Sequence, residues 1–202
     1  MQPSEGSLYA SPLAIPEGVL CATLDGWLAA IQPESGTVSW SLCLGHPLFT
    51  SPAYSPACQL LYVGCVNRTL YAVSAHQGAV VWQYATAAPI FSSPVLYDEH
   101  GVLFGCHDHS LYLLDAAEGR LVWRRDLDAE IFASPDFEAA GGRIVAATTK
   151  GDVHLVSNDG AVTQSFRPGG HLFSSPLFLP GQIILGSRDN FLYCYDEEVT
   201  GP

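Results

Sequence analysis

Short apolar runs separated by polar turns follow one another along the whole chain. Four of them, in the middle of the sequence, are Val95–Tyr97, Val102–Cys106, Leu111–Asp115 and Arg120–Leu127. Such runs are too short for helices, they are rich in β-branched and aromatic residues, and none has the 3.6-residue period of an amphipathic helix. The pattern therefore predicts an all-β protein made of short strands.

A five-residue motif recurs in phase with these runs: an aliphatic residue, an aromatic residue, any residue, Ser and Pro. It occurs five times, at Leu8–Pro12, Leu48–Pro52, Ile90–Pro94, Ile131–Pro135 and Leu172–Pro176, and its serines lie 40, 42, 41 and 41 residues apart. The motif divides the chain into repeat units 8-47, 48-89, 90-130, 131-171 and 172-202. Because a catalytic serine is needed only once, we expect the repeated serine to be structural.

Other features repeat with the motif. A pair of small residues precedes a polar turn with hairpin chemistry, namely Asp25-Gly26, Asn67-Arg68, Asp108-His109, Lys150-Gly151 and Asp189-Asn190. In three units a Gly is followed four residues later by a Trp: Gly36 and Trp40, Gly78 and Trp82, Gly119 and Trp123. The fourth unit has Gln164 at that position, and the fifth unit ends after its third run. We therefore expect four strands in each complete unit and 19 strands in all.

A four-stranded sheet that recurs about every 41 residues is typical of a β-propeller blade. A single β-sandwich also has regularly spaced strands, but it gives no reason for one motif to recur five times. The sequence predicts a single β-propeller over residues 1-202, with five repeats of which the last is incomplete, as a part of a larger propeller with exposed blade edges that tend to associate. The small residues would allow neighbouring blades to converge towards the axis, and each Trp would pack against the adjacent blade.

The composition narrows the function. Of the 202 residues 48% are hydrophobic and 14% charged, and 20 acidic side chains outnumber 8 basic ones, which gives a net charge of −12. This composition excludes a disordered chain, and the charge argues against binding to nucleic acid or to an anionic membrane. The sequence has no apolar stretch long enough to span a membrane and no secretory signal at Met1, so we expect a cytoplasmic protein. The six cysteines are expected to be reduced and mostly buried.

Few side chains suggest chemistry. His107 and His109 have the spacing of metal ligands, but they lie in a predicted turn without a third ligand, so no metal is expected. If the protein binds a partner, the hairpins between the second and third strands are the expected face, because they meet the motifs at one end of a propeller. The candidate residues on this face are Arg68, His107, His109, Lys150, Arg188 and Asn190. No catalytic or cofactor-binding residue is predicted.

The segment Leu114–Trp123 resembles the tryptophan-docking repeat of PQQ-like, or quinoprotein, propellers, which are similar to WD40 blades. The repeated Phe-Ser-Ser-Pro and the segment Gly186–Asp196 resemble the C-terminal PQQ-like propeller of the β-alanine-activating enzyme family, also known as aminoadipate-semialdehyde dehydrogenase-like acyl-CoA synthetases. In that family an adenylating domain activates an amino acid with ATP and a carrier domain binds it on a phosphopantetheine thiol. The motifs of neither domain occur in these 202 residues.

The resemblance implies a non-catalytic interaction or scaffold domain without a cofactor, whose partners are other domains of the parent enzyme or another protein. One alternative is a PQQ-dependent quinoprotein oxidoreductase, which would need calcium ligands, an Asp base and commonly adjacent cysteines. A second alternative is a free-standing scaffold for protein assembly, similar to bacterial lipoprotein propellers.

Overall fold

The computed structural model describes residues 6–138 and 142–196, which form 19 strands in five antiparallel sheets. Sheet 1 contains β1 (Leu13–Ile15), β2 (Gly18–Ala22), β3 (Trp27–Ile31) and β4 (Val38–Cys43). Sheet 2 contains β5 (Ala53–Ser55), β6 (Leu60–Cys65), β7 (Thr69–Ser74) and β8 (Val80–Ala85). Sheet 3 contains β9 (Val95–Tyr97), β10 (Gly101–Gly105), β11 (Ser110–Asp115) and β12 (Leu121–Asp126). Sheet 4 contains β13 (Asp136–Phe137), β14 (Ile144–Ala147), β15 (Val153–Val156) and β16 (Val162–Phe166), and sheet 5 contains β17 (Leu177–Leu179), β18 (Gln182–Gly186) and β19 (Leu192–Asp196).

The strands pair in chain order within each sheet, so each repeat is one meander. The predicted all-β class is confirmed, and the strands predicted for the third repeat lie within one residue of β9 to β12. Each four-stranded sheet has a β-bulge between its third and fourth strands, for example at Leu113/Leu114. A bulge increases the local twist. The described residues include no helix that is long and apolar enough to cross a membrane.

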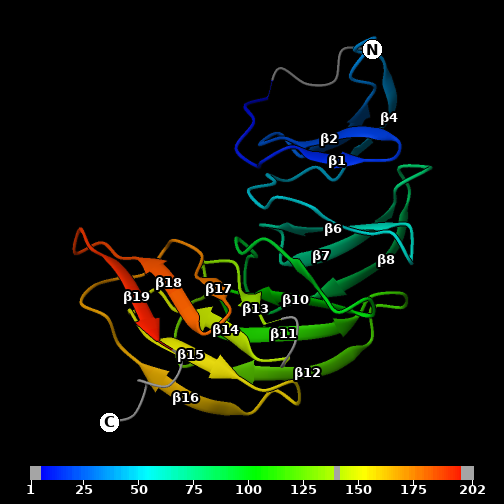
Figure 1. Cartoon of the computed structure of the whole chain (residues 1–202). Helices are drawn as coiled ribbons and strands as arrows, with labels where there is room; N and C mark the ends of the chain where they lie inside the picture. The colour runs from blue at the N-terminus through cyan, green and yellow to red at the C-terminus, as the bar shows by residue number, and fades with distance from the viewer. Residues whose placement is uncertain (1–5, 139–141, 197–202) are drawn as a thin grey trace.

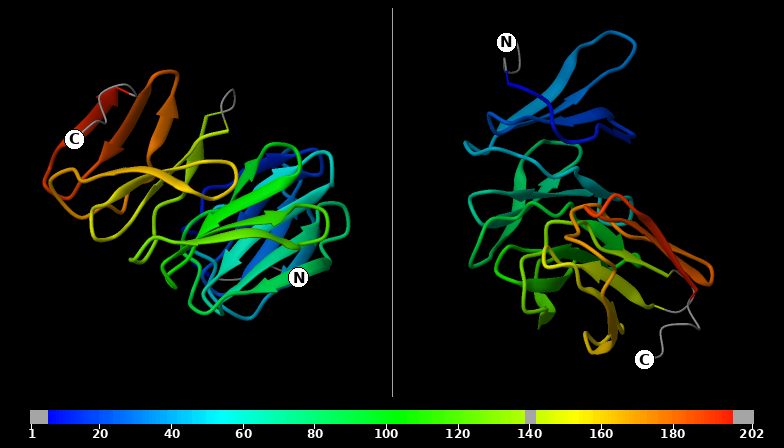
Figure 2. Two further views of the ribbon diagram at one scale, coloured as in Figure 1. Left: turned by 90° about the horizontal axis from the view of Figure 1, so that it is seen from below. Right: turned by 90° about the vertical axis from the view of Figure 1, so that its left-hand side faces the viewer.

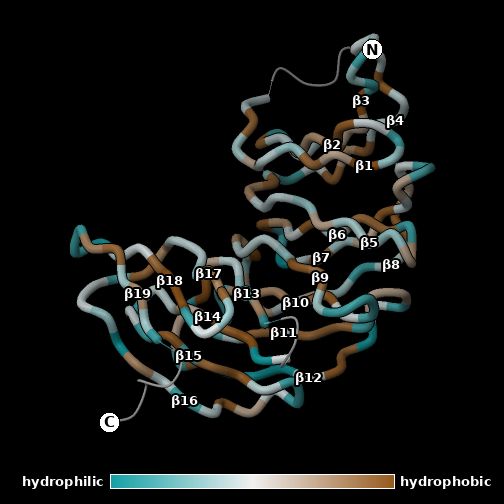
Figure 3. The backbone as a smooth tube through the Cα atoms, viewed as in Figure 1, coloured by the Kyte–Doolittle hydropathy of each residue, from teal (hydrophilic) through white to brown (hydrophobic). Residues whose placement is uncertain are grey.

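The sheets follow one another along an open arc, with sheet 1 (blue) and sheet 5 (red) at its two ends (Figure 1). Figure 2 shows the same sheets from two other sides; in its left view sheet 5 lies opposite sheet 1, which is partly hidden behind the sheets that follow it. First strands of neighbouring sheets contact each other, as β5 contacts β9 and β13 contacts β17. The fourth strands lie on the outside and consist of half-buried and exposed residues, whereas β6 and β10 are buried along their whole length. The hydropathy colouring shows the same contrast (Figure 3).

Four apolar clusters fill the spaces between consecutive sheets. Between sheets 1 and 2, for example, Leu20 and Leu28 pack with Leu61 and Val63, and all four side chains have 0% exposed surface. Sheets 2, 3 and 4 therefore bury apolar residues on both faces, which accounts for the high hydrophobic content of the sequence.

The Trp that follows a Gly by four residues in three of the repeats joins its sheet to the next one. Trp82 of sheet 2 donates its indole N–H to the carbonyl of Ala116 in sheet 3 at 3.2 Å, and its ring covers Gly119, where a Cβ atom would lie 2.6 Å from the ring. Trp40 and Trp123 make the same contacts with Ala75 and Gly78 and with Asn158 and Gly160. The prediction that each Trp packs against the adjacent repeat is confirmed.

The small residues at the ends of β6 and β10 have a more specific cause than expected. A Cβ atom on Gly64 would lie 2.5 Å from Ile90, and one on Gly105 would lie 2.2 Å from Ile131. These isoleucines begin the motif of the following repeat. The glycines are therefore needed mainly because this side chain packs directly against their backbone, with Thr50 and Ser92 also close by. All six cysteines are free, but the expectation that most of them are buried was wrong: only Cys65 and Cys106 are buried, Cys21 and Cys58 are half-buried, and Cys43 and Cys194 are exposed.

Candidate functional site

The five motif serines form a row of hydrogen bonds from sheet to sheet. The amide of Ser11 donates to the hydroxyl oxygen of Ser51 at 2.9 Å, and the amide of Ser51 donates to that of Ser93 at 2.9 Å. Ser93 and Ser134 continue the row, each donating its amide at 3.0 Å to the next serine, the last of which is Ser175. Four bonds thus use the repeated serine for structure, as the sequence predicted.

The aromatic residues of the motifs form a second row beside the serines. The rings of Tyr9, Phe49, Phe91, Phe132 and Phe173 follow one another with centroids 5.4 to 5.6 Å apart. Rings at such spacing attract each other through edge and offset contacts. The two rows together fix the positions of the motifs along the arc.

The hairpins between the second and third strands of each sheet lie at the same end of the molecule as the motifs. In sheet 3 the amide of His107 donates to the carbonyl of Pro89, just before the motif, at 3.2 Å, and in sheet 5 the amide of Arg188 donates to the carbonyl of His171 at 3.1 Å. We call the surface formed by these hairpins and motifs the hairpin end. All six residues singled out in the sequence lie there: Arg68, His107, His109, Lys150, Arg188 and Asn190.

The second residue of every hairpin turn has a left-handed backbone. Its φ angle is +89° at Gly26, +69° at Arg68, +72° at His109, +99° at Gly151 and +71° at Asn190. Glycine adopts this conformation freely and asparagine tolerates it, whereas other residues are strained by about 1 to 2 kcal/mol. Arg68 and His109 are exposed, so their side chains do not repay this strain with buried contacts.

Two of the six candidates contact the aromatic row. The guanidinium of Arg188 lies 3.8 Å from the ring centroid of Phe173, within the range of a cation–π contact. The imidazole of His107 lies 4.6 Å from the ring of Phe91, and its buried Nε2 atom has no hydrogen-bond partner. Burial lowers the pKa of His107, so the neutral form is favoured there.

The other candidates have separate surroundings. Lys150 donates its ammonium to the carbonyl of Asp128 at 2.9 Å and so joins the hairpin of sheet 4 to sheet 3. A hollow of about 290 Å³ lies beside Arg188 and Asn190 and is bounded by Phe173 and Phe191. No group of three or more potential metal ligands is present among the described residues, around His107 and His109 or elsewhere.

Sequence reasoning missed a contact that shapes three of the hairpins. Tyr112 donates its hydroxyl to the carboxylate of Asp108 at 2.6 Å, Tyr193 donates to Asp189 at 2.5 Å, and the amide of Asn67 donates to Tyr71 at 2.8 Å. Burial and the nearby carboxylate raise the pKa of Tyr112. The available signal was a Tyr four residues after an Asp or Asn in repeats 2, 3 and 5.

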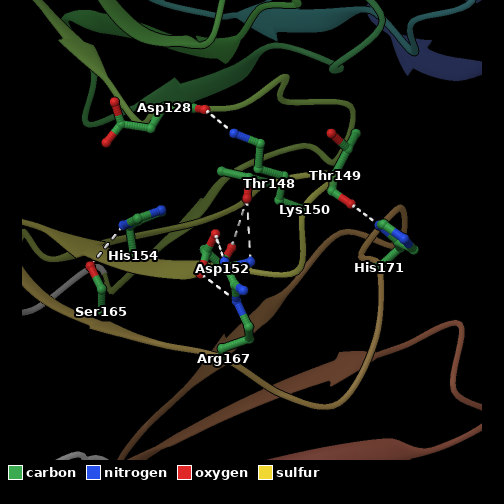
Figure 4. A network of polar contacts seen from close by, with 9 residues as sticks. All are labelled: Asp128, Thr148, Thr149, Lys150, Asp152, His154, Ser165, Arg167 and His171. Atoms are coloured by element: carbon green, nitrogen blue, oxygen red, sulfur yellow. Dashed lines mark hydrogen bonds and ion pairs between the residues drawn. The ribbon is translucent and has the colours of Figure 1, made fainter.

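Sheet 4 replaces this pair with a different polar network (Figure 4). His154 takes the place of the Tyr, and its Nδ1 atom lies 2.8 Å from the hydroxyl of Ser165. Arg167 forms two hydrogen bonds of 2.7 Å with the carboxylate of Asp152 and thereby lowers its pKa. Burial lowers the pKa of His154, whose Nε2 atom has no hydrogen-bond partner.

Known structures are similar to this fold. BamB from Moraxella catarrhalis superposes with a TM-score of 0.85 and 20% identity, over 97% of this chain and 63% of that chain. The computationally designed Ika8 protein superposes with a TM-score of 0.80 and 13% identity, over 92% of this chain and 57% of that one. At these identities the likeness concerns the fold alone.

Sequence comparison is more specific. A segment of 54 residues is 39% identical to the β-alanine-activating enzyme of Homo sapiens, and it amounts to 26% of this chain and 5% of that enzyme. The family model described as the β-propeller of the β-alanine-activating enzyme matches residues 1–196, almost the whole chain. The chain therefore belongs to the β-propeller family of β-alanine-activating enzymes.

Proposed function

We propose that this propeller is a non-catalytic interaction domain that docks other parts of an amino-acid-activating enzyme or a protein partner at its hairpin end. In the parent enzyme an adenylating domain would use ATP, and a carrier domain would hold the amino acid on a phosphopantetheine thiol. The propeller itself would supply a binding surface and take no part in the chemistry.

The left-handed residues of the hairpins carry this proposal. Gly26 and Gly151 meet the backbone requirement of the turn without strain, whereas Arg68 and His109 present long exposed side chains at the same position. A residue held in a strained conformation without internal contacts suggests a role outside the fold. A further argument is that the repeated serines and most of the hairpin Asp and Asn side chains serve structural contacts, which leaves little for catalysis.

We further propose that the five sheets are a part of a larger propeller. The support is that 97% of this chain superposes on only 63% of the similar BamB chain. In such a ring the hairpin end would continue around the axis, so the docking surface would be larger than the part described above.

The test measures the affinity of the chain for separately purified adenylating and carrier domains by calorimetry. We expect the double variant Arg68→Gly, His109→Gly to bind at least about tenfold more weakly, because two or more contacts of about 1 kcal/mol are lost. Arg120→Ala is the matched control, since Arg120 is exposed at a turn between third and fourth strands, away from the hairpin end. Absent binding, or equal affinities for the double variant and the wild type, would contradict the proposal.

A quinoprotein activity would give a different result. If the chain were a PQQ-dependent oxidoreductase, PQQ with calcium would raise its thermal midpoint in a saturable manner. We expect no such rise. A saturable rise would refute the non-catalytic proposal, and it would do so independently of the docking measurement.

A further inference from the structure

The last sheet leaves one apolar face uncovered. Leu192 of β19 is 75% exposed, whereas Leu111, at the same position of sheet 3, has 0% exposed surface because sheet 4 covers it. Leu177 of β17 is 48% exposed, and Cys194 is exposed where sheet 3 has the buried Leu113. These positions form the face with which every earlier sheet contacts its successor.

The first sheet leaves the complementary face uncovered. A hollow of about 140 Å³ there is lined by residues of β2, β3 and the segment before them, including Cys21, Trp27 and Ile31. In sheet 2 the same face carries Leu61 and Val63, which are completely buried against sheet 1. The two hollows described in this structure therefore both lie at the ends of the arc.

The motif contact is also incomplete at both ends. Leu8 begins the first motif and is 59% exposed, whereas Ile90 and Ile131, at the same position, are completely buried against Gly64 and Gly105. Conversely, a Cβ atom on Gly186 of the last sheet would meet only the side chain of Ser174. One end thus has an aliphatic side chain without its glycine, and the other has a glycine without its aliphatic side chain.

The row of serines ends in the same complementary way. Within the described residues, the amide of Ser175 has no serine hydroxyl to donate to, and the hydroxyl of Ser11 accepts no serine amide. The donor left over at one end matches the acceptor left over at the other.

We propose that two copies of this chain associate head to tail, with the open face of sheet 5 in one copy against the open face of sheet 1 in the other. The contact would repeat the one made four times inside the chain, with Leu8 of the second copy over Gly186 and the hydroxyl of its Ser11 accepting from the amide of Ser175. The occupant is a second copy because the open face of sheet 1 is the surface of this chain that has the matching side chains.

The geometry favours an open assembly. One arc corresponds to 63% of the similar BamB chain, so two arcs exceed a single planar ring. The second copy must rise along the axis beyond the shared interface, and a heterologous contact that does not close gives pairs and longer species as concentration increases. This association does not depend on the docking function proposed above. It concerns the present chain of 202 residues by itself, because the further blades of a larger propeller would cover the same two faces.

Sedimentation of face-blocking variants tests the inference. The wild type is expected to show an average mass that rises with concentration in the micromolar range, whereas Leu8→Arg and Leu192→Arg are each expected to stay monomeric. Both residues are exposed in the single chain, so both variants should fold. Val122→Arg is the matched control, since Val122 is 58% exposed on the outer strand β12, away from both end faces, and this variant should associate as the wild type does.

Mixing the two blocked variants gives the decisive result. Leu8→Arg retains a free sheet 5 face and Leu192→Arg retains a free sheet 1 face, so an equimolar mixture should form heterodimers and nothing larger. A wild type that remains monomeric would overturn the proposal. So would dimers of either single variant, which would indicate contact between like faces, or a mixture that stays monomeric.

Discussion

Sheets 3 and 4 follow each other in the chain, yet they fasten their outer strands differently. Sheet 3 uses Trp123, which bonds to the carbonyl of Asn158 and covers Gly160 of sheet 4. Sheet 4 has Gln164 at that position, and its outer strand instead meets sheet 5 through Phe166, whose ring centroid lies 4.5 Å from that of Tyr195. The comparison teaches that the repeat needs an aromatic contact between neighbouring sheets more than it needs a Trp at one position.

The hairpins of these two sheets also differ. In sheet 3 Tyr112 and Asp108 hold the hairpin by a bond within the sheet. In sheet 4 the corresponding residues are His154 and Lys150, and Lys150 reaches across to the carbonyl of Asp128 in sheet 3. Both hairpins also have backbone bonds, so the difference lies in the side chain at this position: Asp108 accepts a bond from a tyrosine of its own sheet, whereas Lys150 donates to the preceding sheet.

The largest difference in stability between the two sheets should come from removing the side chain of Trp123. Trp123→Ala is expected to lower the free energy of unfolding by about 3 kcal/mol, the lower end for a large aromatic side chain, because Trp123 is only half-buried. Gln164→Ala, at the equivalent position, should lower it by less than about 1 kcal/mol. Urea denaturation measures both losses when it is followed by far-ultraviolet circular dichroism, because that signal does not rely on the fluorescence of the Trp that is removed. Equal losses would show that Trp123 is not the main contact of sheet 3 with sheet 4.

The hydrogen bond of the sheet 3 hairpin should have a smaller effect. Tyr112→Phe removes the shortest of three hydrogen bonds to the part-buried carboxylate of Asp108, which keeps those from the amides of Ala87 and Ser110, and it is expected to lower the free energy of unfolding by about 1.5 kcal/mol. Tyr84→Phe is the matched control, because Tyr84 packs against Tyr112 but its hydroxyl has no hydrogen-bond partner in the described structure. Denaturation of the two variants side by side provides the measurement, and an equal effect of both would assign the loss to packing alone.

A contact could be predicted from the sequence where its residues recur at the same position of several repeats. The position of Trp123 carries a Trp in three repeats and the motif serine occurs in all five, so this recurrence alone indicated that both are structural. The pair of Tyr112 and Asp108 also recurs, but in three repeats and with Asn in one of them, which obscures it among ordinary turn residues. The stacking of Arg188 on Phe173 joins two separate turns, and its counterpart in sheet 3 is a histidine, His107, beside Phe91, so the residue type at this position gives no repeated signal in the sequence.

The equivalent positions 112 and 154 should respond differently to acid. Burial lowers the pKa of His154 below its ordinary value of 6.5, so the unfolded chain binds a proton at a higher pH than the folded one. The stability from neutral His154 is therefore present above pH 6.5 and is lost as the pH falls from there through the lowered pKa. Tyr112 does not titrate in this range.

His154→Gln tests this pH dependence, since glutamine can still bond to Ser165 but carries no titrating group. Between pH 6.5 and pH 5 the variant should lose less stability than the wild type, as measured by thermal unfolding at each pH. Both proteins should still lose some stability over this pH range because of His107, whose pKa is also lowered. Parallel curves for the two proteins would exclude His154 as the source.

The smallest expected change is a gain in stability. Arg68→Gly relieves the strain of a left-handed residue, but glycine also increases the entropy of the unfolded chain, so the net stabilisation should be about 0.5 kcal/mol. The reverse change in sheet 4, Gly151→Ala, should destabilise the protein, because its Cβ atom would lie 2.4 Å from the carbonyl oxygen of Gly170. Thermal midpoints of the two variants should move in opposite directions, and a loss of stability in Arg68→Gly would mean that the arginine is needed for folding.

The hydrogen bonds in the row of serines all run in one direction along the chain. This direction affects how the number of repeats can change during evolution. Each repeat supplies one amide to the repeat after it and one hydroxyl to the repeat before it. A gene duplication that inserts a whole repeat therefore adds a donor and an acceptor together and leaves no polar group stranded within the row. Repeat number can change in steps of one while every junction keeps the same chemistry, whereas the gain or loss of part of a repeat would interrupt the row at that point.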